Sequence, residues 1–321
     1  SEHKPTRDRL KHPLLRVKGK LVPVSWDVAL DIMAGVSTHV LQAHGEHAWG
    51  MRTYSYQFFE NTYAISKLCF ASIQTPCYTF HDAPTIGPES AGFAESGIQT
   101  FSASYEDFEQ ADVIFISGTD PYETKTVLFT EWIYPGGAKL IYALPRKTMG
   151  VAYAEKSEGL WLPVIPGTDT ILHLALTRLI LERGWEDKEF LERWASTQWE
   201  IDAGFGRGPR NTPVEWRTTW GKYGATFEGY KKWILGYQYA ELETASRITG
   251  VPKEYMIRAA EMLTGAGGPR PKASFAFEKG NYWSNNYLNT ASFAALALVC
   301  GAGNRPGRGA SRLGGHQRGW A

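Results

Sequence analysis

The sequence predicts an α/β fold built on a parallel sheet. Three strand–turn–helix units support this prediction, because each short apolar run leads into a polar turn and then into helix-compatible sequence. The strands are expected at 113–116, 139–144 and 162–165, and the third unit continues into a helix over 170–183. Hydrophobic residues make up 43% of the 321 residues, which is enough to bury a sizeable core.

Two helices are expected before this series. Residues 1–24 are basic and contain proline, and we expect them to wrap around a surface. Ser25 then begins an amphipathic stretch in which apolar residues recur at roughly helical spacing as far as Leu41. Residues 60–73 predict the second helix.

After the series, the chain is predicted to leave the sheet and then return to it. Residues 200–235 are rich in Trp and Gly and indicate a long irregular excursion on the surface. Gly and Pro make 265–271 a linker by composition. The regular elements expected around this linker are helices at 241–249, 253–263 and 289–300 and a strand at 273–277.

This order of elements predicts two α/β domains. Because the strand–turn–helix series is confined to 110–185 and a linker follows, we expect 25–80 and 265–321 to form one discontinuous domain. Residues 81–264 would form a second domain inserted into the first. The chain begins at Ser1 without Met or a signal peptide and ends just after a dense glycine motif, so we expect an internal piece of a longer protein.

The composition excludes several classes of protein. A net charge of +1 gives no reason to expect a nucleic acid or a polyanionic membrane as partner. No apolar run reaches membrane-spanning length. Cys69, Cys77 and Cys300 form no CxxC pair, which excludes an iron–sulfur or zinc motif within this sequence. A GxxxxGK[ST] loop is absent, and the glycines of 204–208 follow no strand, so they do not predict a dinucleotide site.

Polar turns follow all three strands of the series: GTDP at 118–121, LPRKT at 144–148 and PGTD at 166–169. In a parallel sheet these turns share one edge, where ligands bind and where backbone N–H groups at helix starts suit phosphate oxygens. Asp120 and Asp169 could accept hydrogen bonds from a guanine or a ribose, and Arg146 could pair with a phosphate. For any single turn, helix capping is an equally good explanation.

Two further segments carry candidate site residues. The loop 81–89 has His81 at one end and Glu89 at the other, although such a loop is by itself often only a loop. The closing segment 301–319 is so dense in glycine that its backbone is expected to pass close to a bulky ligand, with a flexible loop as the alternative.

Taken together, these segments resemble the large subunits of arsenite oxidases, in the dimethyl-sulfoxide-reductase family of molybdenum enzymes. The resemblance runs over nearly the whole chain. The turns occur in variant form across that family, whereas EKGNYWSNNY and RLGGHQRG are more specific. Iodate reductases are near relatives and so are the competing interpretation. The stretches that carry the resemblance are YSYQFFENTYAISKL (54–68), FISGTDPYETKTVLFTEW (115–132), LPRKTMGVAYAE (144–155), PVIPGTDT (163–170), GFGRGPRNTP (204–213), EKGNYWSNNY (278–287) and RLGGHQRG (312–319).

The resemblance implies two Rossmann-like domains, one inserted in the other, that grip molybdenum bis(molybdopterin guanine dinucleotide). In this scheme 25–80 plus 265–321 is the molybdopterin-binding domain, and 81–264 binds a guanosine end of the cofactor. A 3Fe-4S cluster would lie in a preceding N-terminal domain. The residues expected at the cofactor are Gly118, Thr119, Asp120, Pro121, Glu123, Pro145, Arg146, Lys147, Thr148, Gly167, Thr168, Asp169, Glu278, Lys279, Gly280, Trp283, Asn304, Arg305, Gly315 and Gln317.

The same resemblance implies oxidation of arsenite to arsenate. His81, Glu89, Arg312 and His316 match the family's substrate residues and provide hydrogen-bond donors and an acceptor for As–OH groups. No protein side chain is expected on the metal.

An Ala faces the metal in these enzymes, and either Ala83 or Thr85 occupies that position here. Asp82 is the residue that could contradict this expectation.

Partners and alternatives follow from the same comparison. A small Rieske 2Fe-2S subunit, a soluble cytochrome c or cupredoxin as electron acceptor, and a periplasmic location with membrane association through the small subunit are implied. The direction of electron flow is not fixed by sequence, so a reductase of iodate or another oxyanion is the alternative. A metal-free nucleotide-binding α/β protein is an alternative of a different class.

Overall fold

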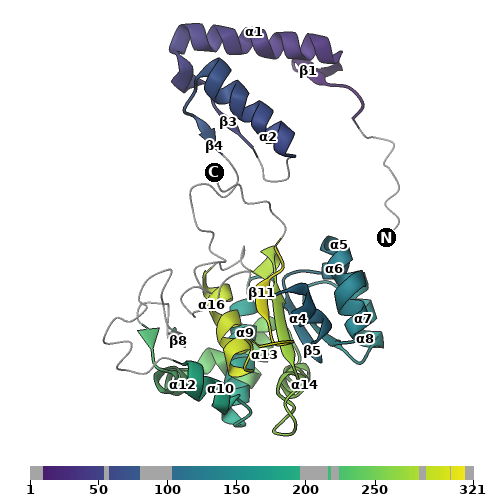
Figure 1. The fold of residues 1–321 in the computed structure, drawn as a ribbon, viewed down its shortest axis with the longest axis vertical. Coiled ribbons are helices and arrows are strands. Elements are labelled where there is room, and N and C mark those ends of the chain that lie inside the picture. The colour runs from purple at the N-terminus through teal and green to yellow at the C-terminus, as the bar shows by residue number, and fades with distance from the viewer. Residues whose placement is uncertain are drawn as a thin grey trace. The chain divides into compact units, whose positions relative to one another are not determined.

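A computed structural model describes seven segments of the chain: 10–53, 58–79, 103–195, 216–217, 224–281, 287–303 and 305–314. They belong to two compact units, the first comprising Ser1–Thr85 with His316–Ala321 and the second Ile86–Gly315 (Figure 1). Each unit is considered by itself.

The first unit is small and has little buried surface of its own. Strands β1 (Leu14–Val17) and β2 (Lys20–Pro23) form an antiparallel hairpin. Helix α1 (Trp26–His44) begins as predicted, because the Ser25 side chain accepts a hydrogen bond from the backbone N–H of Val28. No residue of α1 or α2 is buried. The remaining elements are η1 (Glu46–Ala48), β3 (Met51–Arg52), α2 (Phe59–Ser66), the π-helical η2 (Lys67–Ile73) and β4 (Tyr78–Thr79).

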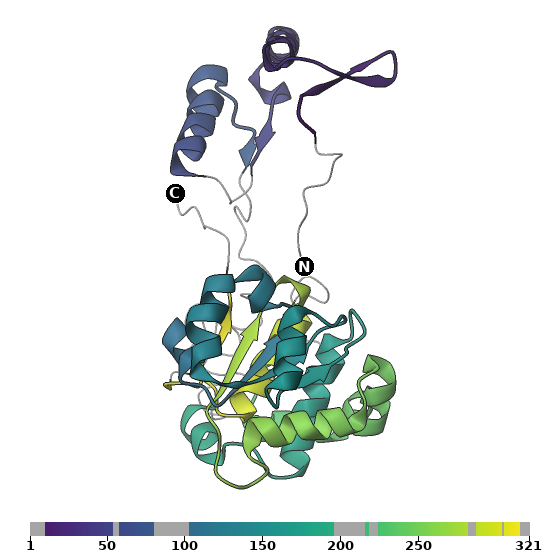
Figure 2. The same cartoon turned by 90° about the vertical axis from the view of Figure 1, so that its right-hand side faces the viewer.

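The second unit is built on a sheet of five parallel strands in the order β11–β10–β5–β6–β7. This arrangement confirms the predicted α/β class. The chain fills the sheet from the centre outwards, because β6 and β7 lie on one side of β5, while β10 and β11 lie on the other (Figure 2). The strands are β5 (Val113–Ser117), β6 (Lys139–Ala143), β7 (Leu160–Leu162), β10 (Ala273–Phe277) and β11 (Ala310–Arg312).

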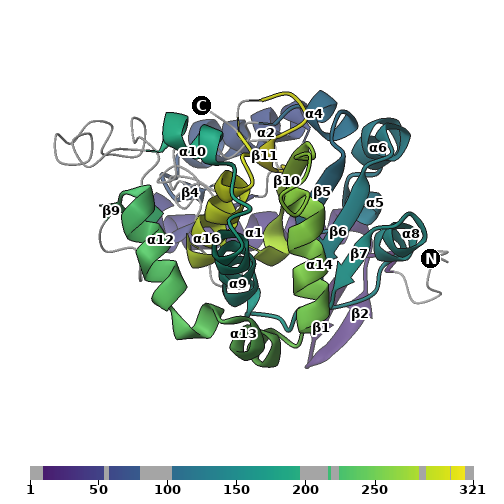
Figure 3. The same cartoon turned by 90° about the horizontal axis from the view of Figure 1, so that it is seen from below.

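Helices cover both faces of the sheet (Figure 3). One face carries α4 (Tyr105–Glu109), the short helices between β5 and β6, and α8 (Met149–Lys156). The other face carries the remaining helices, centred on α9 (Asp169–Glu182). The elements between β5 and β6 are α5 (Pro121–Thr124), α6 (Thr126–Leu128), the π-helical η3 (Phe129–Ile133) and α7 (Tyr134–Gly136). On the second face they are α10 (Lys188–Trp194), α12 (Phe227–Gly236), η5 (Gln238–Ala240), α13 (Leu242–Thr249), α14 (Lys253–Thr264) and α16 (Tyr287–Val299), and β8 (Trp216–Arg217) pairs with β9 (Gly224–Ala225).

The two cores follow from the alternation of side chains along each strand. In β5, Val113 and Phe115 enter the core beneath α9, and Ile114 and Ile116 enter the core beneath α8. Because helices cover both faces of the sheet, the central strands consist of consecutive apolar residues rather than of alternating apolar and polar residues. This explains why the sequence located β5 and β6 well.

Two predictions about boundaries are corrected. The third strand, expected at 162–165, lies at Leu160–Leu162, because Pro163 has no N–H to donate to a neighbouring strand. The segment 265–271 was expected to separate two domains. It is instead a turn that begins with left-handed Gly265 after α14 and leads directly into β10.

Residues 265–314 therefore fold with 103–264 in the described part of the chain. Strand β10 pairs with β5 along its whole length, and α16 packs against α9. The expected division at residue 265 does not occur there, and an association of 25–80 with 265–321 stays a prediction.

A close backbone contact joins the ends of β5 and β10. The N–H of Gly280 donates to the carbonyl oxygen of Gly118 over 3.0 Å. A Cβ atom on Gly118 would lie 2.1 Å from the backbone nitrogen of Asn281, and the φ angle of Gly118 is +67°. Glycine is required at position 118 both for its left-handed backbone and for the approach of the second loop.

A buried polar chain ties the same region to the helices above it. The Nε2 atom of His173 in α9 lies 3.3 Å from Ser117 Oγ, and its Nδ1 atom lies 3.1 Å from Ser292 Oγ in α16. Burial lowers the pKa of His173 to about 3, so its ring is neutral at physiological pH. His173 is therefore a packed residue of α9.

We expect Gly118→Ala to destabilise the protein more than Gly137→Ala. Both glycines have similar positive φ angles, +67° and +70°, but a Cβ on Gly137 meets nothing within 4 Å. The backbone conformation alone should cost about 1–2 kcal/mol in each variant. The clash at Gly118 should add about 1–3 kcal/mol. Urea unfolding of the full-length protein, followed by tryptophan fluorescence, measures both, and equal losses would contradict the contact described here.

Candidate functional site

The carboxyl edge of the sheet gathers the three predicted turns. Ser117, Ala143 and Leu162 end β5, β6 and β7, and a polar turn follows each strand. The chain reverses its direction of travel across the sheet between β5 and β10. In open α/β sheets, such a switch point at the carboxyl edge is where ligands bind.

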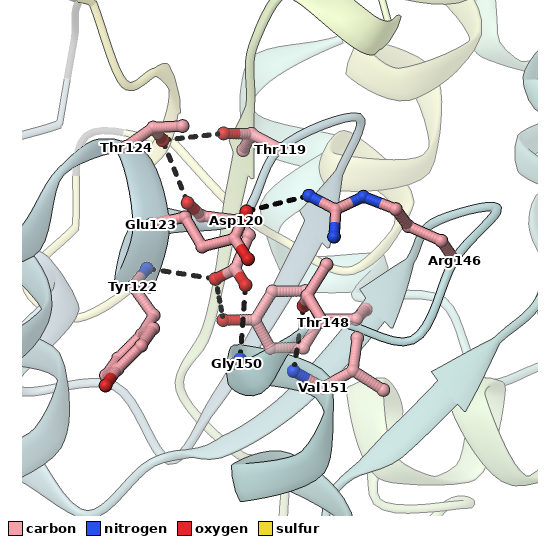
Figure 4. Close-up of polar contacts among 10 residues, drawn as sticks. Thr119, Asp120, Tyr122, Glu123, Thr124, Arg146, Thr148, Gly150 and Val151 are labelled. Atoms are coloured by element: carbon pink, nitrogen blue, oxygen red, sulfur yellow. Dashed lines mark hydrogen bonds and ion pairs between the residues drawn. The ribbon is translucent and has the colours of Figure 1, made fainter. Parts of the chain in front are cut away.

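Asp120 connects two of these turns. Its Oδ1 atom accepts hydrogen bonds from the N–H of Tyr122 over 2.9 Å and from the Tyr142 hydroxyl over 3.3 Å. Its Oδ2 atom accepts from the N–H of Gly150 over 3.1 Å (Figure 4). The carboxylate thus caps α5 and fixes the start of α8 beside it. For Asp120 the structure shows the capping role that the sequence left open.

Paired charges occupy the outer part of this edge. Arg146 Nη2 lies 2.7 Å from Glu123 Oε2, so two of the predicted cofactor residues bind each other (Figure 4). Lys147 pairs with Glu155 of α8 over 2.5 Å. Thr148 caps α8 by accepting from the N–H of Val151 over 3.2 Å. Of the other predicted residues here, Thr119 and Pro121 are buried, Gly118 and Thr168 are half-buried, and Pro145 and Gly167 are exposed.

Asp169 differs from these groups because it is buried without a cation. It is the first residue of α9 and is 5% exposed, and no lysine or arginine of the described residues forms an ion pair with it. Burial raises the pKa of Asp169 from 3.8 to about 6, although backbone N–H groups of Asp169 and Gly167 partly oppose the shift. A buried carboxyl that destabilises its own fold is typical of a binding or catalytic position.

The ends of β10 and β11 carry a buried ion pair. Arg312 Nε lies 2.9 Å from Glu278 Oε1, and both side chains are almost completely buried. The structure thus joins a residue expected at the substrate, Arg312, to a residue expected at the cofactor. Lys279 and Gly280 follow Glu278 in the loop that contacts Gly118.

The sequence analysis missed Lys125, which lies between α5 and α6. Its pKa is lowered mainly by burial, with further effects of the charges on Glu278, Lys279 and Arg312. No local motif marked it, because a lysine in a helical stretch is usually a solvated surface residue.

The structure places Arg305 away from Glu278, and its expected role in binding the cofactor stays a prediction. Helix α16 carries the chain from the carboxyl edge back to the amino edge, and β11 then returns to Arg312. Arg305 lies in the loop between them, where it pairs with Asp187 over 2.8 Å and stacks on Phe190. It is therefore at the edge opposite to Asp120 and Asp169.

Several predicted residues lie outside the described segments, so the meeting of the two substrate loops stays a prediction. Among the described residues, no group of three or more His, Cys, Asp or Glu side chains is arranged to hold a metal ion. Within the same residues no helix has the length and apolarity needed to cross a membrane. The predicted positions outside the described segments are His81, Asp82, Ala83, Thr85, Glu89, Trp283, Asn304, Gly315, His316 and Gln317, together with the stretch 204–213.

We expect Asp169→Asn to lower the cofactor content without lowering the stability of the cofactor-free protein at pH 8. The folded-state pKa of about 6 lies above the ordinary 3.8, so this group's contribution to stability is present below pH 3.8 and is lost as the pH rises through about 6. The asparagine avoids this loss of ~3 kcal/mol. Thermal unfolding at pH 4 and pH 8 and assays of bound pterin and metal measure the two effects.

Asp107→Asn is the matched control for this experiment. Asp107 accepts hydrogen bonds from the N–H groups of Ser104 and Gly307 over 3.0 and 3.1 Å and lies before β5, at the amino edge. Its loss should cost about 1 kcal/mol and leave the cofactor content unchanged. Full cofactor content in Asp169→Asn would show that Asp169 has only a structural role.

Comparisons with known proteins agree with this architecture. A family described as "Molybdopterin oxidoreductase" matches residues 9–318. Iodate reductase subunit IdrA of Denitromonas iodatirespirans is 53% identical over 317 residues, covering 98% of this chain and 35% of that protein. Arsenite oxidase subunit AioA of Herminiimonas arsenicoxydans is 31% identical over 345 residues, covering 98% of this chain and 38% of that protein.

A solved structure, acetylene hydratase from Pelobacter acetylenicus, shares the fold with a TM-score of 0.53 and 21% identity, covering 95% of this chain and 37% of that one. The chain thus spans about a third of the length of the curated relatives it matches. The family match over nearly the whole sequence and the 53% identity lead to one conclusion: this chain belongs to the molybdopterin oxidoreductase family.

Proposed function

We propose that the protein containing this chain is the catalytic subunit of an iodate reductase. The observation that carries the proposal is the difference in identity, 53% to an iodate reductase subunit against 31% to an arsenite oxidase subunit, over equal shares of this chain. This reverses the order of the two functions expected from the sequence.

The residues at the carboxyl edge fit a pterin dinucleotide cofactor, which is expected for this family. Asp169 offers a buried carboxyl without a cation, and a guanine N–H or a ribose hydroxyl would provide the missing donor. The Arg146–Glu123 pair is exposed enough to open toward a phosphate. When bound, the molybdenum–pterin group would supply two-electron oxygen exchange with an oxyanion.

The chain's own residues would hold and orient the reactants. The Glu278–Arg312 pair fixes the end of β10 to the end of β11, so that the loops after both strands keep one position. The Gly118–Gly280 contact holds the β5 turn against the same loops. We propose that His81, Glu89 and His316 complete the substrate site. Each two-electron reduction of iodate removes one oxygen atom as water and consumes two protons, so donors such as protonated imidazoles suit this site.

Further parts of the proposal concern the whole protein. Bis(molybdopterin guanine dinucleotide) as the cofactor form, a 3Fe-4S cluster in another domain, and a small Rieske 2Fe-2S subunit are proposed on resemblance. The same holds for exchange of electrons with a soluble cytochrome c or cupredoxin, a periplasmic location, and membrane association through the small subunit. The absence of a protein side chain on the metal is likewise proposed.

The direct test is turnover by the purified full-length enzyme. We expect reduction of iodate by a reduced viologen dye, and slower or no oxidation of arsenite with an oxidised dye acceptor. Metal and pterin analysis of the same preparation tests family membership at the level of bound cofactor. Rapid arsenite oxidation without iodate reduction would favour the arsenite oxidase interpretation. A preparation that binds nucleotide but neither molybdenum nor pterin would favour the metal-free alternative.

Glu89→Ala and His316→Ala test the substrate residues. Both variants of the full-length enzyme should lose about 100-fold or more in kcat/KM for iodate, because positioned acid–base groups contribute about that much. Both should retain the wild-type content of molybdenum and pterin. If both reduce iodate normally, the substrate site has been placed wrongly even though the family is right.

A further inference from the structure

Three arginines of the second unit gather at the amino edge of the sheet. Arg270 lies just before β10, and Arg305 and Arg308 lie in the loop between α16 and β11. Arg305 Nη2 lies 2.8 Å and Arg270 Nε lies 3.8 Å from the same atom, Oδ2 of Asp187. Arg308 Nη2 donates to the backbone carbonyl oxygen of Arg270 over 3.4 Å. We call these three residues the arginine cluster.

The loop that carries two of these arginines is held in one conformation. The N–H of Gly303 donates to the carbonyl oxygen of Arg308 over 2.7 Å, and the N–H of Arg308 donates to the carbonyl oxygen of Arg305 over 3.0 Å. The guanidinium group of Arg305 also stacks on Phe190, 4.6 Å from the centre of its ring. The charged groups are therefore oriented in advance, which lowers the entropic cost of binding a ligand.

Cations outnumber carboxylates at the arginine cluster. Among the described residues, Asp187 is the one carboxylate within ion-pair distance of these arginines. The neighbouring Asp107 and Asp112 accept backbone N–H groups over 3.1 and 2.7 Å. Lys272, whose N–H is the donor to Asp112, adds a further positive charge. Four cations, the three arginines and Lys272, thus face three carboxylates, so the cluster keeps a positive charge.

Each guanidinium group of the cluster has a hydrogen-bond donor without an acceptor. The three atoms are Arg270 Nη1, Arg305 Nε and Arg308 Nη1, and all are buried within the described part of the chain. A charged donor that is withdrawn from water without an acceptor is energetically costly. The side chains of Arg270 and Arg305 are nevertheless 23% and 36% exposed, so a small ligand can approach them from solvent.

The kind of donor indicates the kind of ligand. Guanidinium groups are planar and carry paired N–H donors, which match two oxygens on one central atom better than they match a halide ion. A tetrahedral oxyanion offers four oxygens to the three groups. Burial, followed by the charge on Arg305, lowers the pKa of Arg308, and a bound anion would oppose this effect.

We propose that Arg270, Arg305 and Arg308 form an anion site at the amino edge that takes a tetrahedral oxyanion such as sulfate or phosphate. The site lies at the edge opposite to Asp120 and Asp169. The inference goes beyond the proposed reduction of iodate and does not depend on it.

Arg308→Met and Arg308→Lys in the full-length holoenzyme test the inference, with Lys139→Met as the control. Arg308 forms no ion pair with the described residues, so its replacement leaves the Arg305–Asp187 pair in place. Lys139 begins β6 at the same edge and is paired with Glu158 at 2.7 Å, so its replacement removes one positive charge outside the cluster. Isothermal titration with sodium sulfate, at an ionic strength held constant with sodium chloride, measures binding without turnover.

The wild type should bind one sulfate per catalytic subunit. Arg308→Met should weaken this binding about tenfold or more, because it removes a charge and its hydrogen bonds. Arg308→Lys should restore part of the affinity, since it keeps the charge but not the paired donors. Lys139→Met should match the wild type, and the content of molybdenum and pterin should be unchanged in all three variants.

Crystals of the wild-type holoenzyme grown with selenate give a second measurement that does not depend on whether Arg308→Met folds. The selenium atom should lie among the three guanidinium groups. Absence of sulfate binding by the wild type, or equal affinity in Arg308→Met, would overturn the inference. An acidic side chain from another part of the protein found between the arginines would overturn it too. Loss of molybdenum and pterin in Arg308→Met would overturn it in favour of a cofactor phosphate.

Discussion

The parallel arrangement of five strands is the constraint on which the second unit depends. Every strand of the order β11–β10–β5–β6–β7 runs in the same direction, so every carboxyl end lies at one edge and every return connection crosses a face. Along the chain, β6 and β7 are added to one side of β5, and β10 and β11 are then added to its other side. The turn after β5 and the loop after β10 therefore meet, although the residues that pair across the two strands, such as Val113 and Ala273, are 160 positions apart in the sequence. The contact of Gly118 with Gly280 is the consequence at atomic scale.

Buried polar groups hold this edge in one arrangement. His173 bridges Ser117 and Ser292, and thereby joins the central strand to the helices above it. The Glu278–Arg312 pair does the same for the two strands on the other side. Buried pairs of this kind add little net stability, but leaving either partner alone is strongly destabilising, so they favour a single geometry. Asp169 is the exception, because its carboxyl is buried without such a partner.

The sequence predicted the elements that depend on neighbouring residues, and it did not predict positions that depend on contacts between distant segments. Neighbouring residues alone mark the apolar runs of β5 and β6 and the polar turns that follow them. The structure confirms the α/β class and the shared edge of the sheet at which these turns lie. The position of Arg305 could not be predicted from its neighbours, because α16 reverses the chain and carries the glycine-rich loop with Arg305 to the opposite edge of the sheet. Asp120 and Asp169 look alike in sequence, and only their partners show that one is a cap and the other is not.

The central claim is that the carboxyl edge of this sheet holds one end of the cofactor, with the switch point facing the reactive centre. The structure of the full-length holoenzyme, determined by crystallography or cryo-electron microscopy, tests this most directly. The account predicts a guanosine within hydrogen-bond distance of Asp169 and phosphates near the turns that follow β5 and β6. Cofactor density at the opposite edge, beside Asp187 and Arg305, would contradict it.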